Sequence, residues 1–69
     1  MNKPLPQNII NQKQTLNEVL WVAEVSNASS QNTVRAYAKS ISEALSLVDN
    51  FAIQQLSGSV VLSIELDKN

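Results

Sequence analysis

Side chains that commonly carry out enzymatic chemistry are scarce in this chain. It has no histidine and no cysteine, so the commonest general base and the usual transition-metal ligands are missing. Its single glycine, Gly58, excludes a glycine-rich phosphate loop. We interpret Glu43 and Asp49 as a helix cap and a solvent-facing charge. We therefore expect a protein that is not an enzyme and that has no cofactor or metal.

A mixed apolar and charged surface is the strongest candidate for function. Residues 33–39, TVRAYAK, alternate small with larger side chains, which places the larger ones on one side of a strand. Residues 16–25 form a second strand, whose even positions would join the same sheet face. Tyr and Arg are the residue types that dominate interface energetics. The predicted partner-binding residues are Arg35, Tyr37, Lys39, Leu20 and Val22.

The same face has a purely structural interpretation. Arg35 and Lys39 could form cross-strand ion pairs with Glu18 and Glu24, each contributing a few tenths of a kcal/mol. Asp67 is interpreted as a charge in the polar tail.

The elements that must position these residues are organised around a helix over residues 40–58. Ser40 and Glu43 have the spacing of a capping box, and Gly58 is suited to the left-handed conformation that ends a helix. Between them, apolar residues recur at helical spacing and form one stripe. Its members are Ile41, Ala44, Leu45, Val48, Ala52 and Leu56. Leu47 and Ile53 lie off this stripe and are interpreted as core margin.

Three strands accompany the helix. Residues 16–25 are rich in valine and carry the tryptophan, which favours a strand, although Thr15 and Glu18 also have capping-box spacing. Residues 59–66 form the last strand, with an inward set of Val60, Leu62, Ile64 and Leu66. A right-handed crossover leaves the first strand in the centre. We predict an α+β fold, β-β-α-β, with a three-stranded antiparallel sheet of order 2-1-3 and one helix on one face.

The domain organisation follows from composition. Residues 1–15, with Pro4 and Pro6, form a predicted flexible arm, in which Leu5, Ile9 and Ile10 could anchor a partner. Residues 16–66 form the single domain, and residues 67–69 form a tail.

One alternative architecture stays open. Apolar residues also recur at 4-3-4-3 spacing over residues 33–56, which is typical of one long helix in a helical hairpin or coiled coil. The start signal at Ser40 argues against it.

Charge and hydropathy restrict the partners. With a net charge of -1, the chain has no excess of positive charge to bind the phosphates of DNA, so direct nucleic-acid binding is not favoured. No apolar run approaches the roughly 20 residues of a membrane span. We expect a cytoplasmic protein without membrane contact, and a homodimer through the open sheet face is a further expectation.

The run VRAYAKSISEALSLV, residues 34–48, resembles a pattern in small phage and mobile-element proteins, among them anti-CRISPR proteins of similar length. The resemblance implies a phage-encoded inhibitor in the host cytoplasm. Its partner would be a bacterial protein or ribonucleoprotein complex of host defence, bound stoichiometrically, with Arg35, Tyr37 and Lys39 as contacts.

Residues 30–38, SQNTVRAYA, are similar to the opening of the helical arm-type domain of tyrosine recombinases. This second resemblance implies a nucleic-acid-binding accessory factor and requires the long helix. A small dimeric structural subunit is the third functional class.

Overall fold

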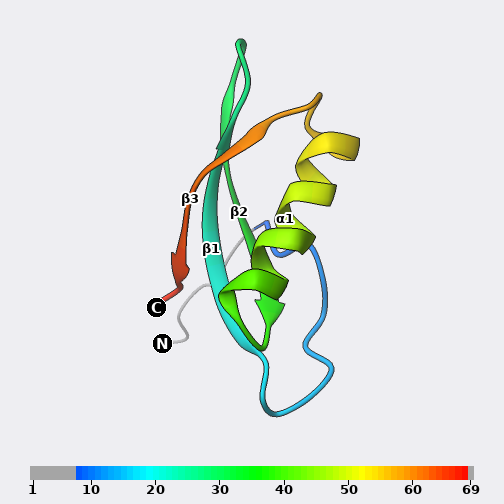
Figure 1. The fold of residues 1–69 in the computed structure, drawn as a ribbon, viewed down its shortest axis with the longest axis vertical. Helices are drawn as coiled ribbons and strands as arrows, with labels where there is room; N and C mark the ends of the chain where they lie inside the picture. The colour runs from blue at the N-terminus through cyan, green and yellow to red at the C-terminus, as the bar shows by residue number, and fades with distance from the viewer. Residues whose placement is uncertain (1–7, 69) are drawn as a thin grey trace, which may run out of the picture.

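Four secondary-structure elements make up the computed structural model, which describes residues 8–68. They are β1 (Val19–Ser26), β2 (Gln31–Ala38), α1 (Ile41–Gln55) and β3 (Val60–Leu66). Both β2 and β3 run antiparallel to the central β1, and α1 packs on one face of the sheet (Figure 1). The predicted α+β fold, its β-β-α-β order and its 2-1-3 strand order are confirmed.

The alternative prediction, a single long helix over residues 33–56, is wrong. Residues 31–38 form β2, which pairs with β1 along its whole length. The resemblance to recombinase arm domains depends on a helix through the same residues, so the structure removes its basis.

Ser40 caps the start of α1 as predicted, but the helix is shorter than predicted and ends before Gly58. Ser40 Oγ accepts a hydrogen bond from the Glu43 amide at 3.2 Å. Gly58 has the expected left-handed backbone, with φ of 73°. Ser57 is also left-handed, with φ of 53°, and the helix therefore ends at Gln55.

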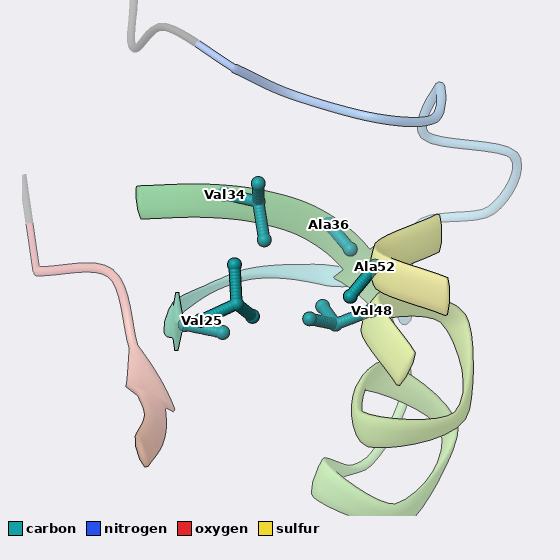
Figure 2. Close-up of a cluster of buried hydrophobic side chains, with 6 residues drawn as sticks. Val25, Val34, Ala36, Val48 and Ala52 are labelled. Atoms are coloured by element: carbon teal, nitrogen blue, oxygen red, sulfur yellow. The ribbon is translucent and has the colours of Figure 1, made fainter. Parts of the chain in front are cut away.

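Small side chains fill the core between α1 and the sheet. Figure 2 shows Val48 and Ala52 of α1 close to valine and alanine side chains of the sheet. The buried apolar residues of the described chain are Ala23, Val25, Val34, Ala36, Ala38, Ala44, Val48 and Ala52. Leu47 packs at the core margin as predicted, whereas Ile41 and Leu45 of the predicted stripe are 49% and 43% exposed. The helix is therefore rotated relative to the predicted stripe.

A β-bulge in β3 shifts the predicted alternation of side chains. Val61 and Ser63 lie opposite consecutive residues of β1, so Leu62 has no partner there. The extra residue reverses the phase of the strand on its two sides. The inward orientation predicted for Val60 is therefore wrong, because Val60 lies opposite Ser26 on the sheet face away from α1 and is 59% exposed. Leu62, at the bulge, is 58% exposed and is not buried in the core as predicted. Val61, predicted to face outward, packs against the core together with Ile64.

Residues 8–11 lie along the outer edge of β2, although they belong to the segment predicted as a flexible arm. The Ile10 amide donates to the Arg35 carbonyl at 2.8 Å. The Asn11 side chain donates to the Tyr37 carbonyl at 2.9 Å and accepts from the Tyr37 amide at 2.8 Å. Ile10 also packs against the core. This segment therefore satisfies backbone groups on an edge that would otherwise be open.

A turn joins this segment to β1. The Glu18 carboxylate accepts hydrogen bonds from the amides of Gln14 and Thr15, the latter at 3.3 Å. The capping-box pattern thus forms a closed turn that no helix continues, and β1 begins at Val19, later than predicted. The predicted anchor Leu5 lies outside the described residues.

Asn27 connects the β1–β2 hairpin to the end of α1. Its Oδ1 accepts from the amides of Ser29 and Ser30 at 2.8 and 2.9 Å, which closes the hairpin turn. Its Nδ2 donates to the Leu56 carbonyl at 3.2 Å, which also accepts from Ser59 Oγ at 2.6 Å. These donors satisfy a carbonyl that the helix end leaves without an intrahelical partner.

We expect Asn27→Ala to lower the free energy of unfolding by about 1–2 kcal/mol, because both the turn and the helix end lose hydrogen bonds. Asn27→Asp is the matched control, since it keeps the turn acceptor and removes only the donor to Leu56. Urea unfolding monitored by circular dichroism should place Asn27→Asp between the wild type and Asn27→Ala. Equal stability of all three proteins would contradict this role.

Candidate functional site

Four of the five predicted binding residues form one contiguous patch. On the sheet face opposite α1, here called the open face, Leu20 lies directly opposite Tyr37 and Val22 directly opposite Arg35. All four side chains are partly buried, and we call them the face patch. Lys39 is exposed just beyond β2 and is not in strand register with them. No helix among residues 8–68 covers the open face.

An ion pair crosses the open face beside this patch. Arg35 Nε lies 2.8 Å from Asp67 Oδ2, and their side chains are 19% and 4% exposed. The Asp67 amide donates to the Leu20 carbonyl at 2.9 Å, which extends the β1–β3 pairing past the end of β3. A charge-assisted hydrogen bond at this distance fixes the guanidinium in one position. The face patch is therefore pre-ordered around Arg35.

The cross-strand ion pair predicted for Arg35 is wrong, because its carboxylate partner is Asp67 and not Glu18 or Glu24. Glu24 instead accepts hydrogen bonds from Thr33 Oγ1, at 2.9 Å to each carboxylate oxygen. Glu18 is buried and binds backbone amides of the turn before β1.

Asp67 is the site residue that sequence reasoning missed, since it was interpreted as a tail charge. The pairing of β1 with β3 places Ser63 and Glu65 on the open face. Continuing the period-two alternation past Leu66 places Asp67 on that face as well. That signal was available, but the predicted strand ends at Leu66, as β3 does, and the alternation was not continued into the tail.

The side chains on the open face are suited to binding a partner. It offers a phenol, a guanidinium held by a carboxylate, and two aliphatic side chains. Among residues 8–68, no three acidic, histidine or cysteine side chains gather to hold a metal ion. Within the same range, the one helix is too short and too polar to cross a lipid bilayer.

Comparisons of the chain with protein-family models, with curated proteins and with solved structures found no match.

Proposed function

We propose that this chain is a small, non-enzymatic protein-binding module that uses the face patch as its contact surface. The observation that carries the proposal is the cross-strand pairing of Leu20 with Tyr37 and of Val22 with Arg35, which gathers four predicted contact residues in one place. A half-apolar sheet face that no helix of residues 8–68 covers favours a partner that completes it.

The composition of the face patch favours a protein as that partner. Tyr37 and Arg35 supply the side-chain types enriched at the centres of interfaces. Arg35 is already held by Asp67, so binding need not order its long side chain. Leu20 and Val22 supply apolar area between the two polar groups.

The finer proposal is a phage-encoded inhibitor that binds a bacterial defence complex stoichiometrically in the host cytoplasm. It is supported by the resemblance of residues 34–48 to small anti-CRISPR proteins. The contact residues implied by that resemblance overlap the face patch at Arg35 and Tyr37, with exposed Lys39 at its end.

The inhibitor proposal is tested by phage plating on a bacterial strain that carries an active type I CRISPR system. We expect expression of the wild-type chain to restore plating, and the double variant Leu20→Ser, Tyr37→Ala to lose this effect. Leu16→Ala, at an exposed position outside the sheet, is the matched control and should restore plating like the wild type. Failure of the wild type to restore plating overturns the inhibitor class.

A further inference from the structure

The outer edge of β3 is the open edge of the sheet. Residues 8–11 occupy the outer edge of β2, whereas nothing among the described residues pairs with β3 on the side away from β1. Natural edge strands are usually protected by Lys, Pro or a bulge. β3 has no Lys or Pro, and after its bulge at Leu62 the strand pairs regularly with β1 over residues 63–66.

Aliphatic side chains gather beside this edge. Leu62 and Leu66 are 58% and 46% exposed, although the core itself contains only alanine and valine. Leu45 of α1 is also exposed, and it lines a groove between α1 and β3. The groove is lined by Ser42, Leu45, Ser46, Asp49, Val60 and Val61. Four of the eight exposed large apolar side chains of the described residues thus lie on β3 or on the facing side of α1.

We propose that this edge binds a second copy of the chain, β3 against β3, in an antiparallel pairing with its twofold axis at Ile64. This register places Leu62 opposite Leu66 of the second copy, and Ser63 opposite Glu65. A hydroxyl then meets each carboxylate, whereas an axis at Glu65 would place like charges opposite one another. The pattern of β3 is therefore complementary to itself in one register.

The surface area that two copies would bury at the β3 edge is typical of a weak dimer. The exposed parts of Leu45, Leu62 and Leu66 correspond to roughly 250 Å² of apolar surface per copy, or about 400 Å² with polar groups included. Two copies would bury about 800 Å², the size of a transient interface. We expect a dissociation constant on the order of 10–100 μM. The six-stranded sheet would carry both helices on one side and both face patches on the other.

Sedimentation equilibrium of the full chain over about 10 μM to 1 mM tests this inference independently of the face patch. We expect the apparent mass to rise from monomer to dimer. Leu62→Lys should weaken the association by at least about tenfold, because it places a hydrated charge opposite Leu66 in both apolar pairs that flank the twofold axis. Leu66→Lys is the second variant at the edge, and Leu16→Lys is the matched control remote from it.

A wild-type chain that stays monomeric throughout overturns the proposal and leaves the β3 edge to a different partner. Dimerisation that the two edge variants weaken no more than Leu16→Lys does also overturns it. A dimer that both edge variants weaken, while circular dichroism shows an unchanged fold, supports it.

Discussion

Val48→Asp is expected to abolish the native fold. Val48 is fully buried and packs between α1 and the sheet (Figure 2). A carboxylate at this position would lose its hydration inside an apolar cluster, which costs several kcal/mol. A domain of this size has a free energy of unfolding of only about 5 kcal/mol. The cost of burying the carboxylate is therefore comparable to the entire stability of the fold.

The matched control is Ile53→Asp, on the same helix at a position 57% exposed. It should change the free energy of unfolding by less than about 1 kcal/mol, because the new charge stays in water. Thermal unfolding by circular dichroism measures both proteins. A cooperative transition in Val48→Asp at the wild-type temperature would show that the packing of α1 on the sheet is wrong.

Asp67→Ala is expected to lower the free energy of unfolding by about 2 kcal/mol. The substitution removes a carboxylate whose side chain is 4% exposed and which lies 2.8 Å from the Arg35 guanidinium. The loss of a charge-assisted hydrogen bond in a water-poor setting explains the size of the effect. The hydrogen bond from the Asp67 backbone amide to the Leu20 carbonyl would remain.

Glu65→Ala is the control, because Glu65 is an exposed acid on the same face. It should cost no more than about 0.5 kcal/mol. A double-mutant cycle with Arg35→Met separates the pair from its surroundings, and the coupling should account for most of the Asp67→Ala effect. Equal effects of Asp67→Ala and Glu65→Ala in urea unfolding would contradict the structural role of the ion pair.

Local signals in the sequence were sufficient for the architecture. The cap at Ser40 and the left-handed Gly58 limit α1, and the alternation in residues 33–39 predicts β2. The right-handed crossover rule then leaves one strand order. These features depend on neighbouring residues, and a single sequence records them directly.

Features that depend on the relation between two strands were not predictable in the same way. The bulge at Leu62 has no glycine or proline to mark it, and it appears only in the register of β3 against β1. Regular alternation therefore assigned Val60 to the wrong face and predicted burial for Leu62, which is exposed. The rotation of α1 that exposes Ile41 and Leu45 likewise depends on packing against the sheet.

The candidate site was likewise predictable from the sequence only in part. Alternation alone places Arg35 and Tyr37 on one face, and strand pairing brings Leu20 and Val22 beside them. The choice of Asp67 as the partner of Arg35 depends on how far β3 extends along β1. The edge formed by residues 8–11 depends on amide side chains, Asn11 among them, whose backbone contacts leave no periodic pattern in the sequence.

Partner binding by the face patch is tested most directly by capture from a bacterial lysate with three tagged baits. These are the wild type, the double variant Leu20→Ser, Tyr37→Ala, and the control Leu16→Ala; Arg35 stays unchanged because it holds Asp67. Each capture is carried out with and without nuclease and quantified by mass spectrometry. We predict that the wild type and Leu16→Ala capture the same protein complex at stoichiometric yield after nuclease treatment, and that the double variant, folded by circular dichroism, loses it. Equal capture by all three baits, or capture that nuclease abolishes, would contradict protein binding through the face patch.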